Sequence, residues 1–123
     1  MKRDWDCVRA ILTMLEEQSS STSMLQPKDV LGWDVDTVSY HMSLLEQAGL
    51  IEAVCQRRPN AAVFCLGSSL TWSGHELLEN MRRPETWNRV RSVATEKGIE
   101  LSLDAIKAIG AWGVHQVLSG RFQ

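Results

Sequence analysis

The chain has 123 residues, of which 44% are hydrophobic and 23% charged, a balance typical of one globular domain with a modest core. Its formal net charge of −2 gives no overall attraction for nucleic acid, so any basic surface must be local. No apolar run approaches the roughly 20 residues of a membrane-spanning helix, and the charged N-terminus is unlike a signal peptide. We therefore expect a cytoplasmic protein with no membrane partner.

Apolar residues spaced three and four apart predict a first helix over residues 4–17. Asp4 lies in its first turn, where a negative charge favours the helix dipole. Residues 18–23 are polar and of low complexity, which is typical of a connecting loop. Residues 27–31 begin with a proline and suit a short helix.

The stretch from Thr37 to Ile51 is the element around which we expect the other segments to pack. At about 100° per residue on a helix, its apolar face comprises Val38, His41, Met42, Leu45 and Ala48. The opposite face, predicted to point outward, comprises Asp36, Ser39, Tyr40, Ser43 and Gln47. Asp34 suits the N-terminal cap of this helix, and Gly49 suits a left-handed C-terminal cap.

Two extended segments, residues 50–57 and 62–66, flank the sequence Arg58-Pro59-Asn60-Ala61. Because Pro-Asn at the centre of four residues is sound turn chemistry, we expect a β-hairpin over about residues 50–66.

Two helices are predicted after the hairpin. Thr71 can cap the first, which covers roughly residues 72–83. Pro84 opens the second, over residues 85–97, and Gly98 ends it.

A last helix, capped by Ser102, is apolar on two faces. One face comprises Leu103, Ile106, Gly110, Gly113, Val114 and Val117. The other comprises Ala105, Ala108, Ile109 and Trp112. A helix that is apolar on two faces must be buried on both, so we expect the second face to form a homodimer interface. The alternative is a helix embedded in the core of a monomer.

The central stretch also carries a family resemblance. Val38-Ser39-Tyr40-His41-Met42, followed by Leu45 and Ala48-Gly49-Leu50-Ile51, resembles the recognition helix of small metal- and redox-responsive winged-helix repressors. Leu70-Thr71-Trp72-Ser73-Gly74-His75-Glu76-Leu77-Leu78 resembles the exit from the wing in regulators of the multiple-antibiotic-resistance type.

These resemblances imply a mainly α fold with a small β-hairpin. They place a winged helix-turn-helix domain at residues 1–83, with its wing at about residues 50–66. Residues 84–123 would form a C-terminal helical extension, which serves as a dimerisation element within the same compact unit.

A second resemblance covers nearly the whole chain. The opening Met1-Lys2-Arg3-Asp4-Trp5-Asp6, together with the central helix and the T-W-x-G-H-E motif, is similar to a family of uncharacterised bacterial proteins, often borne by prophages. That family is classed as a domain of unknown function. The resemblance implies a fold and hardly any activity, because function is argued from sites rather than folds.

Residues typical of an enzyme are missing from the sequence. It contains no phosphate-binding glycine loop, no nucleophile elbow and no histidine pair at metal spacing. We expect His41 to be a hydrogen-bonded core residue, and His75 beside Glu76 to serve capping or packing rather than catalysis. The sequence therefore predicts a non-enzymatic protein without a metal or other cofactor.

Three cysteines without C-x-x-C spacing do not indicate a disulfide framework or a zinc site. We expect them to be small buried apolar residues. Cys55 and Cys65 can lie opposite each other on the hairpin, so a stress-dependent bridge is the alternative, disfavoured in a reducing cytoplasm.

A winged-helix protein inserts its recognition helix into the major groove, contacts phosphates with its wing and binds two half-sites as a dimer. The candidate DNA-binding residues on this resemblance are Lys28, Thr37, Ser39, Tyr40, Ser43, Gln47, Arg57 and Arg58.

The segment 33–51 departs from the repressor pattern because it contains no Lys or Arg, and its acids are Asp34, Asp36 and Glu46. Between residues 57 and 91, however, six arginines face three acids. That excess favours phosphate contacts, although a solvated surface with ordinary ion pairs would look the same.

Two functions remain open from the sequence. The first is a dimeric winged-helix protein that binds double-stranded DNA and regulates transcription of a phage or mobile element. The second is a winged-helix protein-interaction module that does not bind DNA and modulates a host protein. The acidic central helix, with Tyr40 and Trp33 expected to be exposed, suits docking onto a basic protein partner.

Overall fold

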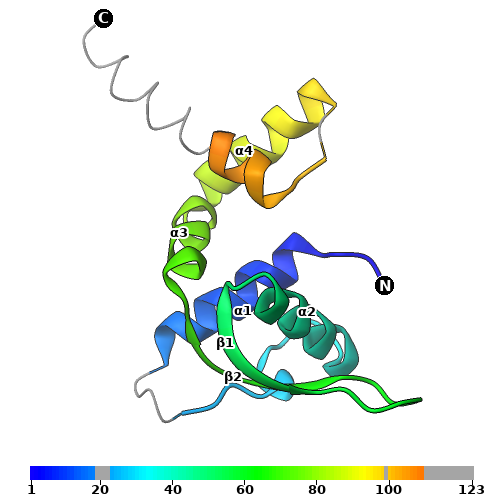
Figure 1. Cartoon of the computed structure of the whole chain (residues 1–123). Coiled ribbons are helices and arrows are strands. Elements are labelled where there is room, and N and C mark those ends of the chain that lie inside the picture. Colours follow the sequence, from blue (N-terminus) through cyan, green and yellow to red (C-terminus); the bar gives the residue numbers. More distant parts are fainter. Residues whose placement is uncertain (19–22, 99, 110–123) are drawn as a thin grey trace, which may run out of the picture. The chain divides into compact units, whose positions relative to one another are not determined.

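The computed structural model describes residues 1–18, 23–98 and 100–109 as a mainly helical chain with one two-stranded antiparallel hairpin (Figure 1). In chain order the elements are α1 (Trp5–Glu17), the 3₁₀ turn η1 (Pro27–Asp29), α2 (Val35–Gln47), β1 (Ile51–Gln56), β2 (Phe64–Leu70), α3 (Trp72–Met81) and α4 (Pro84–Lys97). Residues 103–109 are also helical. None of the helices described here is long and apolar enough to cross a lipid bilayer.

The chain divides into two compact units, and the division falls inside α3. The first unit is Met1–Leu78, and the second begins at Glu79. The boundary expected from the sequence, between the domain and its extension, lies at residues 83 and 84.

Helix α1 begins where an aspartate satisfies its first free amides. Asp4 has extended backbone angles, and its carboxylate accepts hydrogen bonds from the amides of Asp6 at 2.9 Å and Cys7 at 3.4 Å. An N-cap of this kind stabilises a helix by about 1 kcal/mol. The predicted first helix is therefore confirmed, with Asp4 as its cap rather than a residue of its first turn.

Helix α2 is capped at both ends as the sequence predicts. The Asp34 carboxylate accepts from the Thr37 amide at 2.7 Å, and Gly49 follows the helix with φ of 74°. The predicted apolar stripe is buried at Val38, Met42 and Leu45. Ala48, at the end of the helix, is exposed.

Strands β1 and β2 pair antiparallel. In the turn that joins them, the Ala61 amide donates to the Arg58 carbonyl at 3.3 Å. Asn60 adopts the left-handed conformation that such a turn accepts, with φ of 61°. The second strand runs over Phe64–Leu70, so the predicted segment 62–66 was too short and began too early. Gly67, at the middle of β2, also forms an isolated antiparallel bridge with Leu25, outside the two-stranded sheet.

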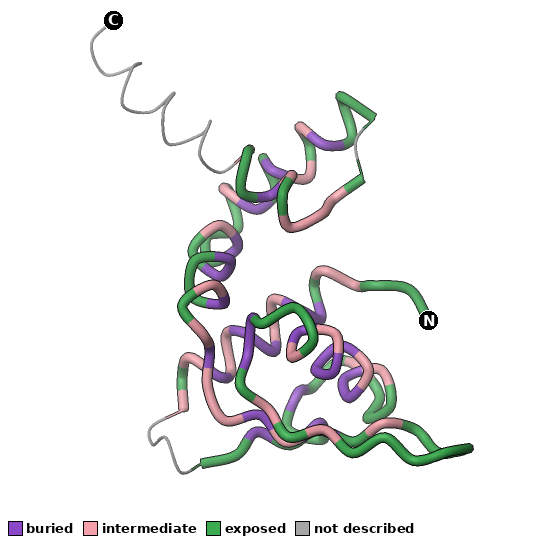
Figure 2. The backbone as a smooth tube through the Cα atoms, in the orientation of Figure 1, coloured by how far each residue is buried: buried purple, intermediate pink, exposed green. Residues whose placement is uncertain are grey.

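The core of the first unit lies where α2 contacts α1, η1 and both strands (Figure 2). Its fully or almost fully buried apolar residues include Cys7, Val8, Ile11, Leu12, Leu15, Leu25, Val38, Met42, Leu45, Ile51 and Cys65. Gly67 lets β2 lie close to side chains of α1 and α2. A β-carbon at this position would lie 3.1 Å from the Met42 side chain and 3.2 Å from that of Leu15.

Helix α3 starts immediately beside the base of the hairpin. The hydroxyl of Thr71 donates to the Gly49 carbonyl at 2.6 Å and accepts from the Gly74 amide at 3.1 Å. The predicted Thr71 cap is thus present, and it also attaches α3 to the end of α2. Gly74 packs directly against the Leu50 carbonyl oxygen, which leaves no room for a side chain.

The second unit has its own buried apolar side chains. They are Met81, Trp87, Val90, Ala94 and Ile106. Helix α4 ends at Gly98, whose φ of 68° is left-handed as predicted. Ser102 caps the following helical residues, because its hydroxyl accepts from the Ala105 amide at 3.1 Å.

Candidate nucleic-acid interface

The surface that α2 presents to solvent is acidic and aromatic. Asp36 and Gln47 are exposed, and Tyr40 is half-buried between them. These three positions fall on one side of the helix at about 100° per residue. Thr37 is half-buried in the first turn, where its amide is already bonded to Asp34.

Two of the predicted outward residues of α2 are buried, which corrects the sequence analysis. Ser39 is only 1% exposed and Ser43 only 4%. The hydroxyl of Ser43 donates to the Tyr40 carbonyl at 2.8 Å, so it turns back onto its own helix. Beside Ser39 lies β2, with the sulfur of Cys65 at 3.7 Å from the Ser39 carbonyl oxygen. Neither serine is therefore available to contact a base or a phosphate.

The hydroxyl of Ser39 has a further peculiarity. It is shielded from solvent and has no hydrogen-bond partner in the described chain. A buried hydroxyl without a partner destabilises a fold, so Ser39 contributes neither surface chemistry nor a stabilising contact.

The hairpin of the first unit carries its two arginines at the tip. Arg57 and Arg58 follow β1 and are both exposed. Glu52, near the start of β1, is the acid of the hairpin strands, and no Asp or Glu occurs between residues 53 and 75. No acid therefore lies next to these guanidinium groups along the hairpin sequence. Guanidinium groups on an exposed turn are suited to phosphate contacts.

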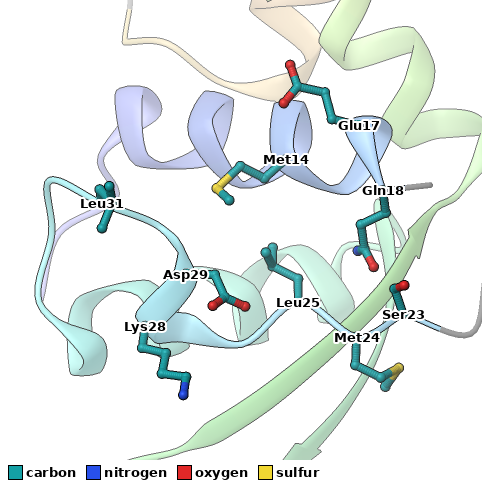
Figure 3. A pocket seen from close by; sticks show the side chains of 9 residues that line it. All are labelled: Met14, Glu17, Gln18, Ser23, Met24, Leu25, Lys28, Asp29 and Leu31. Atoms are coloured by element: carbon teal, nitrogen blue, oxygen red, sulfur yellow. The ribbon is translucent and has the colours of Figure 1, made fainter. Parts of the chain in front are cut away.

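Lys28, the remaining basic candidate, is exposed in η1. It contributes to the rim of an open hollow of about 620 Å³ between η1 and the C-terminal half of α1. In Figure 3, Met14 points from α1 toward the segment that carries Leu25 and Asp29. The hollow is mainly apolar, and Lys28 has the acid Asp29 as its immediate neighbour.

The N-terminal turn of α2 is negatively charged and partly apolar. The pKa of Asp34 lies below its ordinary value, chiefly because the Thr37 amide donates to its carboxylate. Asp36 and Val35 are exposed beside it, and a shallow hollow of about 350 Å³ lies between this turn and Met1. This end of α2 is electrostatically unfavourable for a phosphate.

A hydrogen-bond network that the sequence analysis missed holds α2 against the N-terminus. The indole N–H of Trp33 donates to the Asp4 carboxylate at 2.9 Å. The Asp4 amide donates to Nε2 of His41 at 2.8 Å, and Nδ1 of His41 lies 2.8 Å from the Thr37 carbonyl oxygen. The prediction of a hydrogen-bonded core histidine is confirmed, since His41 is 0% exposed.

The same network affects the predicted protein-docking surface. Burial alone acts to raise the pKa of Asp4, but hydrogen bonds from the Trp33 indole and from two amides of α1 outweigh it, so the pKa lies below its ordinary value. Trp33 is half-buried and its only polar group is engaged. Trp33 and Tyr40 were expected to be exposed, and both are half-buried. The feature of the sequence that could have revealed the network is Trp33, because a buried indole N–H requires a hydrogen-bond acceptor.

The cysteines differ from the simple expectation of buried apolar residues. Cys55 and Cys65 face each other across the hairpin, with Cα atoms 4.1 Å apart, and form a disulfide. Cys7 is a buried free thiol. Burial, with the nearby carboxylates of Asp4 and Asp34, raises the pKa of Cys7 to about 12.

The four predicted dimer-interface residues are only partly within the described chain. Ala105 and Ile109 are half-buried, and Ala108 is exposed. Trp112 lies outside the described residues. The same holds for Gly110, Gly113, Val114 and Val117, which were assigned to the other face of that helix.

No group of three or more His, Cys, Asp or Glu side chains in the described residues could hold a metal ion. His75 lies 3.9 Å from a carboxylate oxygen of Glu16, a weak ion pair if the imidazole is protonated. Because the His75 side chain is 54% exposed, this contact is peripheral, and the expected capping or packing role stays a prediction.

The elements described above define a mainly helical protein in which a largely buried central helix leads directly into a two-stranded hairpin. The chain belongs to the family described as hypothetical protein (DUF2513), whose model matches residues 2–100. A Haemophilus influenzae protein described as uncharacterized is 43% identical over 119 residues, which are 97% of this chain and 100% of the relative. No solved structure matches the chain. The predicted membership of a family of unknown function is confirmed, whereas prophage association stays a prediction.

Proposed function

We propose that the protein is a winged-helix DNA-binding regulator with no catalytic activity. The observation that carries the proposal is the order of elements in the first unit, namely helix, strand bridge at Leu25, short turn η1, helix α2 and hairpin. This order matches a winged helix-turn-helix, in which the second of two helices enters the major groove and a hairpin contacts the adjacent backbone.

The hairpin tip would supply most of the affinity. Phosphate contacts dominate protein–DNA binding and come mainly from Arg and Lys. Arg57 and Arg58 are exposed on a turn whose strands contain no acid after Glu52. Lys28 on η1 would add a third positive charge on another element.

Helix α2 would supply a small number of base contacts. Tyr40 and Gln47 are the outward candidates that stay accessible, and a glutamine can donate to and accept from an adenine edge. Asp36 would lie away from phosphate or accept from a cytosine amino group. Few base contacts and an acidic α2 imply modest specificity for each copy of the domain.

Two copies would then be needed to recognise an operator. The apolar second face of the C-terminal helical residues is the proposed dimer element, with Ala105, Ala108, Ile109 and Trp112 as its candidates. A two-fold dimer would read two half-sites about one helical turn apart. Regulation of a phage or mobile-element operon is the biological role that the sequence resemblance suggests.

Salt-titrated fluorescence anisotropy with a labelled duplex of mixed sequence tests the proposal. Binding should weaken steeply as salt increases, because released counterions drive it. The plot of log K against log salt has a negative slope. In Arg57→Ala/Arg58→Ala its magnitude should fall by roughly 1.8, the value for two lost phosphate contacts. Lys97→Ala/Lys107→Ala is the matched control, because it removes the same charge from exposed positions that are not among the candidate DNA-binding residues.

Absence of binding at low salt, or binding that does not depend on salt, would contradict the proposal. Equal slopes for the two double variants would show that net charge, and not the hairpin tip, is responsible. Light scattering of the same samples tests the dimer, and a solution mass equal to one chain would contradict it.

A second function is favoured by one observation, the surface at the start of α2. Val35, which lies between Asp34 and Asp36 in sequence, is 45% exposed, and Leu31, in the connection from η1, is 84% exposed. Such a surface suits a basic protein with an apolar contact patch better than it suits phosphate. On this alternative, the protein binds a host protein and no DNA.

Affinity capture with the full chain as bait tests the alternative. A stoichiometric partner should be recovered by the native chain and lost with Val35→Ser or Tyr40→Ala. Arg57→Ala/Arg58→Ala should retain it. Recovery of no partner, together with salt-dependent DNA binding, would leave only the first proposal.

A further inference from the structure

The disulfide of the hairpin joins the two strands immediately before the arginine tip. Cys55 and Cys65 are a directly opposed pair in the register, separated by ten positions in sequence. Cys55 is half-buried, whereas Cys65 is 0% exposed and packs against α2. Cys55 is thus the more exposed residue of the pair and the one that a reductant can approach, whereas Cys65 is part of the core.

Reduction would give the buried sulfur a new contact. The Cys65 sulfur lies 3.7 Å from the Ser39 carbonyl oxygen, within reach of an S–H···O hydrogen bond. A disulfide sulfur has no hydrogen and cannot donate it. The disulfide joins β2 to β1, whereas the reduced Cys65 thiol can bond to α2, so β2 stays attached to a neighbouring element in either redox state.

We propose that the Cys55–Cys65 pair is a reversible thiol–disulfide switch that controls the order of the hairpin tip. The bond closes the segment containing Arg57 and Arg58 into a small ring, which restricts the conformations of both guanidinium groups. Without the bond, the tip is held only by the last hydrogen bonds of a two-stranded hairpin, which is marginally stable by itself. The pair therefore couples the redox state to how well the arginines are positioned.

The chemistry is an exchange with a dithiol or with glutathione. A reductant thiolate attacks the accessible Cys55 sulfur, the bond to Cys65 breaks, and the released Cys65 thiolate takes up a proton. A second thiolate then attacks the reductant sulfur of the mixed disulfide, which releases Cys55 as a thiolate that is also protonated. The pair gains two electrons and two protons, and the reductant becomes a disulfide. Oxidation by oxidised glutathione is the reverse reaction.

Cys7 is separate from this exchange. It is buried on α1, and its thiol stays protonated because its pKa is raised to about 12. A protonated and inaccessible thiol is a poor nucleophile. The switch therefore involves two of the three cysteines, and Cys7 is an internal standard for labelling.

The regulatory consequence rests on the DNA-binding function proposed above, but the redox step itself does not. If the arginine tip contacts phosphates, the oxidised protein should bind DNA more tightly, because less conformational freedom is lost on binding. The reduced protein should bind with the same salt slope and a lower affinity.

The test equilibrates the full chain in buffers of defined reduced-to-oxidised glutathione ratio and counts alkylated cysteines by mass spectrometry. We expect the Cys55–Cys65 bond in the oxidising buffers and free thiols in the reducing ones. Trypsin cleavage of the Arg57–Arg58 bond should be several-fold faster in the reduced protein; Pro59 protects the next bond in both states. Cys55→Ser should be cleaved at the faster rate in every buffer.

Free thiols in every buffer, a bond that no glutathione ratio opens, or equal cleavage rates would overturn the switch. Duplex binding in the same buffers distinguishes the two proposals. Tighter binding of the oxidised protein that Cys55→Ser abolishes would support both. No binding in either state, with the bond still reversible and cleavage still redox-dependent, would remove the DNA-binding function and leave the switch. Equal affinities in both states would overturn the coupling between the bond and the arginines.

Discussion

The amide of Asp4 donates to Nε2 of His41 at 2.8 Å, across 37 positions of the sequence. The acceptor role of Nε2 places the imidazole proton on Nδ1, where it donates to the Thr37 carbonyl. A backbone amide at the start of α1 is thereby satisfied by a side chain of α2. Since Asp4 also caps α1 and accepts from Trp33, one residue links the N-terminus, α1 and the turn before α2.

His41→Phe should destabilise the fold by about 1–3 kcal/mol, because it leaves the partly buried Asp4 amide without an acceptor. The phenyl ring keeps most of the imidazole volume, so the variant tests the hydrogen bond rather than a cavity. Urea unfolding followed by circular dichroism measures the difference. His75→Phe is the control, because its imidazole is half-exposed, and it should change stability by less than about 0.5 kcal/mol. Equal losses in the two variants would contradict the role assigned to His41.

Stability should decrease in acid, and Asp4 should contribute to the decrease. The pKa of Asp4 is lowered in the folded state from its ordinary value of 3.8, so the folded protein binds this proton more weakly than the unfolded chain does. The resulting stabilisation is present above the unfolded value and is lost as the pH falls through the lower folded value. Asp4→Asn removes this contribution, so its loss of stability should be larger at pH 7 than at pH 3.

Urea unfolding at both pH values measures the effect of Asp4→Asn. Glu96→Gln, which removes an exposed carboxyl of α4, is the control for the change in net charge. A loss of stability for Asp4→Asn that is the same at pH 7 and pH 3 would mean that the charge of Asp4 does not contribute.

The helix ends could be predicted from the sequence because capping is local. Asp34, Gly49, Gly98 and Ser102 each act within a few residues of their own helix. The full length of β2 could not, since Gly67-Ser68-Ser69 lacks the apolar alternation of a strand. This segment is held in the sheet by β1 and by the distant Leu25.

The candidate site was predicted less well than the fold. Like the length of β2, the burial of its residues depends on contacts with distant segments of the chain. Tyr40 and Gln47 remain accessible, but Ser39 and Ser43 are buried although they lie on the polar side of the helix. Helical periodicity assigns a face by residue polarity, whereas burial depends on which other elements cover that face. Here the hairpin and η1 cover more of α2 than one apolar stripe requires.

Ser39→Ala should leave stability unchanged or raise it by up to about 1 kcal/mol, because it removes a buried hydroxyl without a partner and improves helix propensity. Ser43→Ala is the matched comparison, since its hydroxyl donates to the Tyr40 carbonyl at 2.8 Å. It should lose up to about 1 kcal/mol of stability. Urea midpoints of the two variants measure the difference. A larger loss in Ser39→Ala than in Ser43→Ala would mean that the Ser39 hydroxyl has a partner.

Cys7 should resist alkylation in the folded protein. Its thiol is buried and, with a pKa of about 12, is almost entirely protonated at pH 8.5, whereas the thiolate is the reactive form. Iodoacetamide should therefore label Cys7 in urea and not in native buffer, as mass spectrometry of tryptic peptides can show. Half-buried Cys55 of the reduced protein is the comparison within the same sample. Labelling of Cys7 as fast as Cys55 in native buffer would contradict its burial.

Gly74→Ala should destabilise the fold even though it adds a better helix former to α3. Alanine at an exposed helix position would gain about 1 kcal/mol over glycine. At Gly74, however, the added β-carbon collides with the Leu50 carbonyl oxygen and lies 3.1 Å from the carbonyl carbon. A backbone group cannot rotate away, so α3 must move from the base of the hairpin. The hydrogen bond of 3.1 Å from the Thr71 amide to the Leu50 carbonyl would be strained or broken.

We therefore expect a net loss of about 1–3 kcal/mol for Gly74→Ala, in the range of other overpacked sites. Ser73→Ala, one position earlier on the same helix, is the control, because its half-buried side chain can be shortened without a collision. It should be neutral or slightly stabilising through helix propensity. Chemical denaturation of both variants measures the difference. If Gly74→Ala proved as stable as Ser73→Ala, α3 would not pack against Leu50, and the attachment of α3 to the hairpin would have to be placed elsewhere.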